Sequence, residues 1–89
     1  MDLDARIVQH IELNPSRPGL VNARLREYGV AVWALIGYLR AADGDTDRVA
    51  ADYDVPRTAV EGAIVYNEHY PTIIDARLDA TSAPSLHAV

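Results

Sequence analysis

The acidic run DGDTD (Asp43–Asp47) holds the densest set of possible metal ligands in the chain. Carboxylates at alternate positions open a calcium-binding loop, and Asp54 falls at the twelfth position of such a loop. The sixth position needs glycine for a sharp turn, but here it is Arg48. A helix that begins just after Asp45 accounts for the acids better, because carboxylates favour helix N-termini.

The other reactive side chains do not form a recognisable catalytic site. His10, His69 and His87 are far apart and lack the spacing of zinc ligands. The sequence has no cysteine, no nucleophile motif and no glycine-rich phosphate loop. We therefore expect no catalytic residue, metal or cofactor, and interpret the chain as a binding protein and not an enzyme.

All eight basic residues are arginines, and the charge is unevenly distributed. Residues 1–42 carry five arginines and four carboxylates, a net charge of +1, whereas residues 43–89 carry three arginines and nine carboxylates, a net charge of −6. The arginines are typical of a GC-rich coding sequence, or alternatively serve bidentate contacts with phosphate or carboxylate. Any basic face for nucleic acid must come mostly from the first half.

The stretch RVAADYDVPRTAVEGAI (Arg48–Ile64) has the spacing of a helix-turn-helix. Ala50 provides the small residue where the two helices cross, and Asp54 tolerates the left-handed backbone that the turn requires. Apolar residues are spaced to fill the interface, namely Val49, Tyr53, Val55, Val60 and Ala63. The pattern predicts a helical pair of the kind that often reads DNA.

The predicted second helix of this pair has an outward face with little base-reading chemistry. Helical periodicity places Val60, Ala63, Ile64 and Asn67 inward, and Thr58, Glu61, Gly62, Val65 and His69 outward. Phosphates would repel Glu61, although its carboxylate can accept from a cytosine amine. The candidate DNA-binding residues are Arg48, Arg57 and Thr58, helped by Arg24 and Arg26.

Two short β-elements are predicted in the N-terminal third. Alternation favours a strand over Gln9–Leu13, and Ala23–Gly29 is a candidate second strand beyond the Pro- and Gly-rich turn Asn14–Gly19. A helical stripe also fits the first segment, formed by Leu3, Ile7 and Ile11. Arg17, Arg24 and Arg26 cluster here, as ordinary solvated charge, as a basic ribbon for DNA, or as an anchor for an acidic partner surface.

Four helices are expected after this element. The first lies within Val30–Gly44, with a buried stripe of Val32, Leu35, Ile36 and Leu39 and with Gly44 at its end. The second follows Asp45 or Thr46 as N-cap, the third begins at Pro56 and runs to about His69, and the fourth begins at Pro71. The fold class is thus mainly α (α+β): a short N-terminal β-hairpin-like element followed by a four-helix bundle that contains the helix-turn-helix.

Domain organisation and localisation follow from composition. Residues 1–80 make one small domain, and residues 81–89 are expected to be a flexible C-terminal tail. No apolar run reaches the roughly 20 residues that span a bilayer. The acidic N-terminus lacks a signal-peptide pattern, so we expect a cytoplasmic protein without a membrane partner.

Most of the chain resembles a known family. RPGLVNARLREYGVAVWALIGYL, followed by DGDTDRVAADYDVPRTAVEGAIVYNEHYPTIIDARL, is similar to the bacterial domain-of-unknown-function family number 433. The resemblance covers about Arg17 to Leu78. Between Glu27 and Val32 the chain departs from the family's usual Gly-Thr-Arg-Ile-Pro-Val pattern.

The resemblance implies an antitoxin of a type II toxin–antitoxin pair. Such proteins bind a cognate toxin, often a PIN-like ribonuclease, and some bind their own promoter DNA as homodimers. For this chain it implies toxin contacts through the last helix and the tail, with Ile74, Leu78 and Leu86 as candidates, and a dimer formed by the N-terminal β-element. The alternatives are a stand-alone transcriptional regulator and an adaptor domain that has lost DNA binding.

Overall fold

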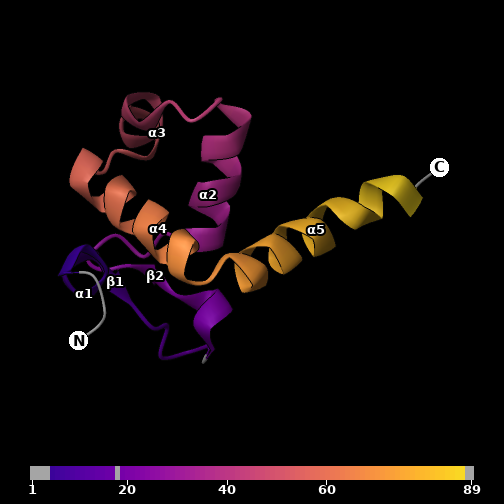
Figure 1. Ribbon diagram of the computed structural model, residues 1–89, viewed down its shortest axis with the longest axis horizontal. Helices are drawn as coiled ribbons and strands as arrows, with labels where there is room; N and C mark the ends of the chain where they lie inside the picture. Colours follow the sequence, from indigo (N-terminus) through magenta and orange to yellow (C-terminus); the bar gives the residue numbers. More distant parts are fainter. Residues whose placement is uncertain (1–4, 18, 88–89) are drawn as a thin grey trace.

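The computed structural model describes the backbone of residues 5–17 and 19–87, with side chains for these residues apart from 6, 8 and 81–87. The predicted fold class is confirmed: the chain is mainly helical, with a two-stranded antiparallel sheet near its N-terminus (Figure 1). The elements in order are α1 (Ala5–His10), β1 (Ile11–Glu12), the 3-10 helix η1 (Leu20–Asn22), β2 (Arg24–Leu25), α2 (Val32–Ala41), α3 (Thr46–Tyr53), α4 (Arg57–His69) and α5 (Pro71–His87).

The N-terminal segment combines the two elements that its sequence pattern allowed. Residues Ala5–His10 form α1, which contains Ile7 of the predicted helical stripe, whereas Leu3 lies outside the described residues. The chain then becomes extended at Ile11 in β1, which pairs with β2 in the register Ile11↔Leu25. Ile7 and Ile11 are both buried, which explains why the apolar residues suit either element. The strands are shorter than predicted. On the β2 side, Glu27 and Gly29 adopt positive φ and turn the chain toward α2.

The end of α2 is a Schellman motif, one residue earlier than predicted. Asp43, not Gly44, is the first residue with positive φ, at 58°. The Asp43 N–H donates to the Arg40 carbonyl oxygen at 3.1 Å, and the Gly44 N–H donates to the Leu39 carbonyl oxygen at 2.9 Å. These bonds satisfy carbonyls that would otherwise be unpaired. Asp45 then caps α3.

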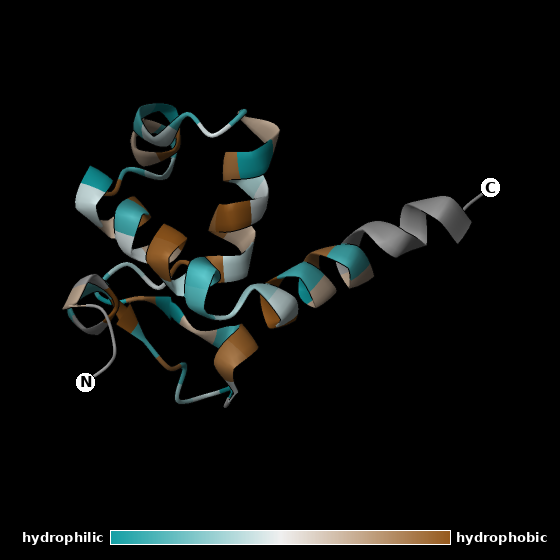
Figure 2. Cartoon of the chain, in the orientation of Figure 1, coloured by the Kyte–Doolittle hydropathy of each residue, from teal (hydrophilic) through white to brown (hydrophobic). Residues whose placement is uncertain are grey.

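Helix α4 is the centre of the fold. It contacts α1, α2 and α3, and the core residues contributed by α4 are Ala59, Val60, Gly62, Ala63, Val65 and Tyr66. Two residues predicted to face outward, Gly62 and Val65, are therefore buried. The reason is that α1 packs on α4, which the local periodicity of α4 does not encode. Figure 2 shows hydrophobic residues concentrated on α2, on α4 and in the first turns of α5.

Helix α5 leaves the domain body as an arm (Figure 1). Its first turns pack against α2 and η1, and the rest extends along the 44 Å axis of the molecule. Seventeen residues make a helix of about 25 Å. The backbone is helical through His87, beyond the end predicted at Ala80, whereas the side chains of 81–87, including Leu86, lie outside the described residues.

Candidate interaction surfaces

The α3–α4 pair has the turn and the core that its sequence predicts. Asp45 Oδ1 accepts the Arg48 N–H at 3.1 Å and so caps α3. Asp54 adopts the left-handed conformation (φ 57°, ψ 48°) that ends α3. Val49 and Val60 are fully buried between the helices. Pro56 lies one residue before α4, and not within it as predicted.

The two candidate DNA-binding arginines of this pair are engaged with carboxylates. Arg57 Nη1 lies 3.3 Å from Asp47 Oδ1, and Arg57 Nε lies 3.3 Å from Glu61 Oε2. Arg48 Nε lies 3.6 Å from Asp52 Oδ2. Exposed ion pairs contribute at most about 1 kcal/mol, so a phosphate can displace them, but the carboxylates then remain beside the phosphate.

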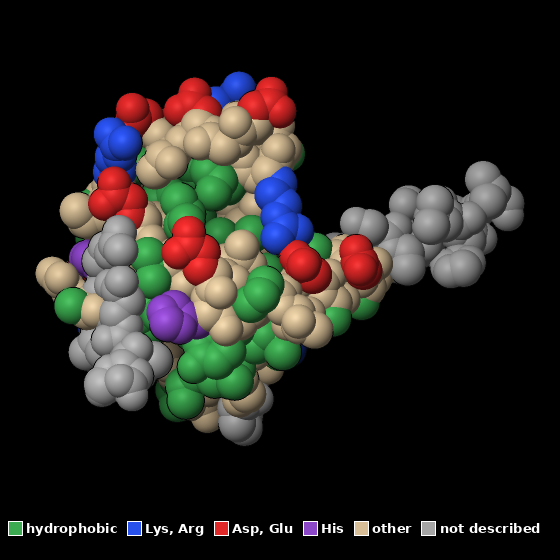
Figure 3. Space-filling model, in the orientation of Figure 1, with side chains coloured by type: hydrophobic (Ala, Val, Ile, Leu, Met, Phe, Trp, Pro, Cys, Tyr) green, Lys and Arg blue, Asp and Glu red, His purple; other side chains and the backbone are tan. Residues whose placement is uncertain are grey.

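The end of the molecule built from α3 and the start of α4 is acidic. Between residues 43 and 61 two arginines oppose six carboxylates, a net charge of −4. Figure 3 shows acidic and basic side chains intermixed over this end of the molecule. On the predicted reading face Thr58 is exposed, whereas Val65 is only 5% exposed. A phosphate backbone would meet neither a cationic surface nor a continuous exposed face of α4.

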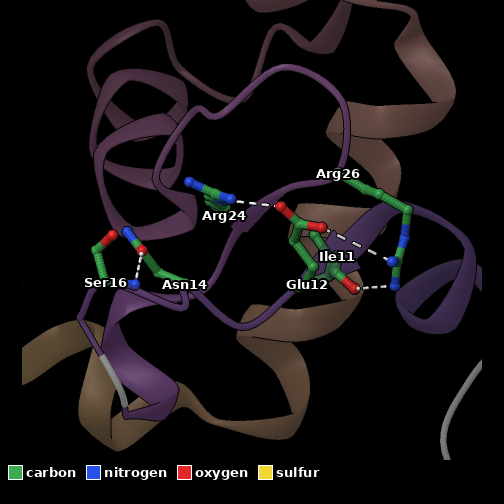
Figure 4. Close-up of polar contacts among 6 residues, drawn as sticks. All are labelled: Ile11, Glu12, Asn14, Ser16, Arg24 and Arg26. Atoms are coloured by element: carbon green, nitrogen blue, oxygen red, sulfur yellow. Dashed lines mark hydrogen bonds and ion pairs between the residues drawn. The ribbon is translucent and has the colours of Figure 1, made fainter.

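Arg24 and Arg26 converge on one carboxylate of β1 instead of forming a basic ribbon (Figure 4). Arg24 Nε lies 2.7 Å from Glu12 Oε2, and Arg26 Nη1 lies 3.7 Å from Glu12 Oε1. Arg26 Nη2 also donates to the Ile11 carbonyl oxygen at 2.9 Å. That carbonyl belongs to a non-hydrogen-bonded pair of the β1–β2 ladder, so Arg26 covers the open edge of β1.

The first turns of α5, which are called its root below, pack against α2. Two of the predicted toxin contacts, Ile74 and Leu78, therefore pack within the domain. Ile74 is fully buried and Leu78 packs against the core. Arg40 Nη2 lies 2.7 Å from Asp75 Oδ1, and the Arg77 guanidinium carbon lies 4.4 Å from the centroid of a Trp33 ring. In this structure Ile74 is not available to a partner, and Leu78 is largely used within the chain.

An apolar groove of about 500 Å³ lies between the N-terminal segment and the end of α4, and it was not among the sites predicted from the sequence. Its lining residues are Ile7, Ile11, Glu12, Leu13, Leu20, Arg26, Tyr66 and Tyr70. Leu13 is 58% exposed and Leu20 is 43% exposed. The available signal was two leucines flanking a Pro- and Gly-rich turn, an apolar pair in a segment that is otherwise polar.

Two tyrosine hydroxyls join distant segments. The Tyr66 hydroxyl donates to the Leu20 carbonyl oxygen at 2.7 Å, and burial raises the pKa of Tyr66 to about 12. The Tyr38 hydroxyl hydrogen-bonds to Asp52, and this bond to a carboxylate raises the pKa of Tyr38. The first contact holds η1 on α4 and the second holds α2 on α3.

The described residues contain no group of three His, Cys, Asp or Glu side chains placed to hold a metal ion. None of the helices formed by these residues is both long and apolar enough to cross a membrane.

No family model, curated protein or solved structure matches the chain. The resemblance to the domain-of-unknown-function family therefore stays a prediction from the quoted motifs.

Proposed function

We propose that the protein is an antitoxin-like binding protein that sequesters a cognate toxin, of the class of PIN-like ribonucleases, in the cytoplasm. The observation that carries the proposal is the projection of α5 from the domain body (Figure 1). A helix whose root is fixed and whose remainder extends beyond its own core suits contact with a second protein. The resemblance described above provides the class of that protein.

Charge supports a partner with a basic surface. A ribonuclease must attract phosphate, so the surface around its active site is positively charged. The chain carries a net charge of −5, and its second half, which includes α3, α4 and α5, carries −6. The acidic half of the chain would attract the basic surface of such a toxin and cover its active site. The toxin would then be inhibited both sterically and electrostatically.

Promoter DNA is the second candidate ligand, either as an additional activity of the antitoxin or as that of a stand-alone regulator. The α3–α4 pair favours it, because Arg48 is exposed in the first turn of α3, and Arg57 and Thr58 are exposed in the first turn of α4. The net charge of −4 around them and the burial of Val65 weigh against it. An adaptor domain without DNA binding fits these two observations as well.

The decisive experiment pairs the protein with the product of the neighbouring reading frame. That product is expressed in a bacterial host, alone and with the full-length protein, and growth is measured. We expect growth arrest that the full-length protein relieves, and inhibition of the purified nuclease on single-stranded RNA. A neighbour that is not toxic, or whose toxicity persists, contradicts the proposal.

A chain ending at Ala80 tests the arm without disturbing its root, because Ile74 and Leu78 are retained. We expect this truncation to weaken relief of toxicity while the thermal unfolding of the domain stays cooperative. A separate titration with duplex DNA from upstream of the gene tests for a regulator. If the protein is a regulator, it should bind this DNA without a toxin, and the affinity should fall steeply as the salt concentration rises.

A further inference from the structure

The apolar groove between the N-terminal segment and the end of α4 has the composition of a small-molecule site. Its volume of about 500 Å³ lies within the range of roughly 300–1,000 Å³ that ligand pockets occupy. Ile7 and Ile11 contribute buried apolar side chains, and the rings of Tyr66 and Tyr70, with centroids 4.9 Å apart, contribute an aromatic side. Among the described lining residues a single ion pair carries charge, and binding pockets likewise combine many apolar groups with a few polar ones.

Two exposed leucines also line the groove. Leu13 and Leu20 are two of the three large hydrophobic side chains that are exposed in the described part of the chain, and the third, Tyr28, lies outside the groove. Figure 3 shows hydrophobic side chains gathered over η1 and the junction of α4 with α5. An apolar molecule in the groove would remove surface of both leucines from water, and this burial favours binding.

The charged end of the groove is positive (Figure 4). Glu12 Oε2 lies 2.7 Å from Arg24 Nε, whereas Glu12 Oε1 lies 3.7 Å from Arg26 Nη1, so Arg24 holds the carboxylate more closely than Arg26 does. The three side chains together carry a charge of +1, in a chain whose net charge is −5. A guanidinium has five N–H donors in a planar fork that suits a carboxylate, so Arg26 can bond the Ile11 carbonyl and a ligand at once.

We infer that the groove binds a small amphipathic carboxylic acid, whose apolar tail packs between Ile11, Leu20 and Tyr66 and whose carboxylate bonds Arg26. One negative charge balances the +1 of the cluster formed by Arg24, Arg26 and Glu12. A phosphate dianion would bring a second negative charge beside Glu12, and an uncharged headgroup would lack the charge-assisted bond to Arg26. The ligand class is therefore an apolar body with a single carboxylate.

Two sides of the groove are held in place before a ligand binds. The Tyr66 hydroxyl donates to the Leu20 carbonyl oxygen at 2.7 Å, and Arg26 Nη2 donates to the Ile11 carbonyl oxygen at 2.9 Å. The first bond ties η1 to α4, and the second ties the end of β2 to β1. A preformed site loses less conformational freedom when a ligand binds.

The test uses octanoate as the probe, because it joins an apolar tail to one carboxylate, and octanamide as its uncharged counterpart of similar shape. An NMR titration of the full-length protein follows the backbone amide signals. We expect those of Leu13, Leu20 and Tyr66 to shift saturably with one octanoate per chain. Octanamide should bind at least about tenfold more weakly, because it lacks the charge that Arg26 recognises.

Two substitutions in the ion pair should change octanoate affinity in opposite directions. Arg26→Gln should weaken binding by at least about tenfold, whereas Glu12→Gln removes the neighbouring negative charge and should tighten it. A groove that collects any apolar molecule would respond to neither. Arg48→Gln is the matched control, since it removes the same charge from an exposed arginine of α3 outside the groove and should leave the affinity unchanged.

The apolar side of the site has its own variant. Leu13→Ser should weaken octanoate binding without changing the charge, and Tyr28→Ser, at an exposed apolar residue outside the groove, should not. Both residues are exposed, so thermal melts followed by circular dichroism should match the natural protein's. Leu13→Ser therefore keeps the test decisive if Arg26→Gln disturbs the N-terminal segment through loss of the bond to Ile11.

Absence of a saturable shift with octanoate would overturn the inference, as would equal affinity for octanamide or an affinity that Arg26→Gln and Leu13→Ser both leave unchanged. A dimeric protein whose groove amides do not respond to octanoate would assign the groove to a second copy and also overturn it. The inference does not depend on the toxin, so relief of toxicity and octanoate binding can fail independently.

Discussion

Gly37 and Leu78 meet where α5 crosses α2, and the Leu78 Cδ2 atom lies only 2.9 Å from the position that a Cβ on residue 37 would take. Glycine at this position lets α5 approach α2 closely enough for Asp75 to reach Arg40. The direction in which the arm leaves the domain therefore depends on the lack of a side chain on α2.

Gly37→Ala should destabilise the protein by about 1 kcal/mol, because Leu78 must move from a packed position and that cost exceeds the gain in helix propensity. In a Leu78→Ala background the same substitution should stabilise, because only the propensity gain remains. Urea unfolding of the four variants measures the coupling. If Gly37→Ala stabilises the protein in both backgrounds, the contact between residue 37 and Leu78 does not limit the side chain that residue 37 can carry.

Tyr66 predicts a loss of stability at alkaline pH. Its pKa is raised from 10 to about 12 in the folded protein, so the protonated Tyr66 hydroxyl makes its full contribution to folding stability below pH 10. Stability then falls as the pH rises from 10 to 12, because the unfolded chain releases the proton more readily than the folded one. Urea titrations at several pH values should show this fall in the parent. Tyr66→Phe should cost about 1 kcal/mol near neutral pH through loss of the bond to Leu20, and should flatten the alkaline dependence.

The left-handed backbone of Asp54, at the turn between α3 and α4, should determine how substitutions there change the stability of the protein. Its φ of 57° is costly for a residue with a Cβ, so Asp54→Gly should be neutral or stabilising, whereas Asp54→Ala should lose about 1 kcal/mol. Thermal unfolding measures both. Ala51→Gly, inside α3, is the control and should destabilise by about 1 kcal/mol. Destabilisation by glycine at both positions would contradict the proposed role of the turn.

The carboxylates around Arg57 predict how DNA affinity depends on charge. The double variant Asp47→Asn, Glu61→Gln frees Arg57 and removes two negative charges, so binding to a non-specific duplex should tighten and its salt dependence should steepen. Fluorescence anisotropy at several salt concentrations tests this. Adding Arg57→Gln should reverse most of the gain. No change in the double variant would mean that the α3–α4 face does not contact DNA.

The helical part of the fold was predictable because its signals are local. The stripe of α2, the Asp45 cap and the left-handed Asp54 lie within a few residues of the structure that they determine. The helix at Ala5–His10 was less predictable, because Ile7 and Ile11 are buried in either a helix or a strand. Tertiary contacts decided between them.

The candidate sites were less predictable because they depend on contacts between distant segments. Val65 is buried because α1, more than fifty positions earlier, covers α4. Glu12 neutralises Arg24 because the strand register places them opposite each other. Ile74 has the spacing of a docking surface, but an apolar residue at that spacing serves a core equally well.

The packing of α1 on α4 also has a consequence for the order of folding. The α2, α3 and α4 segments contact their near neighbours and can condense early, whereas α1 must wait until α4 exists. During synthesis α1 therefore leaves the ribosome before the α4 segment on which it packs, so it is among the last elements to find its native partner. We expect substitutions at Ile7 to accelerate unfolding while leaving the folding rate nearly unchanged.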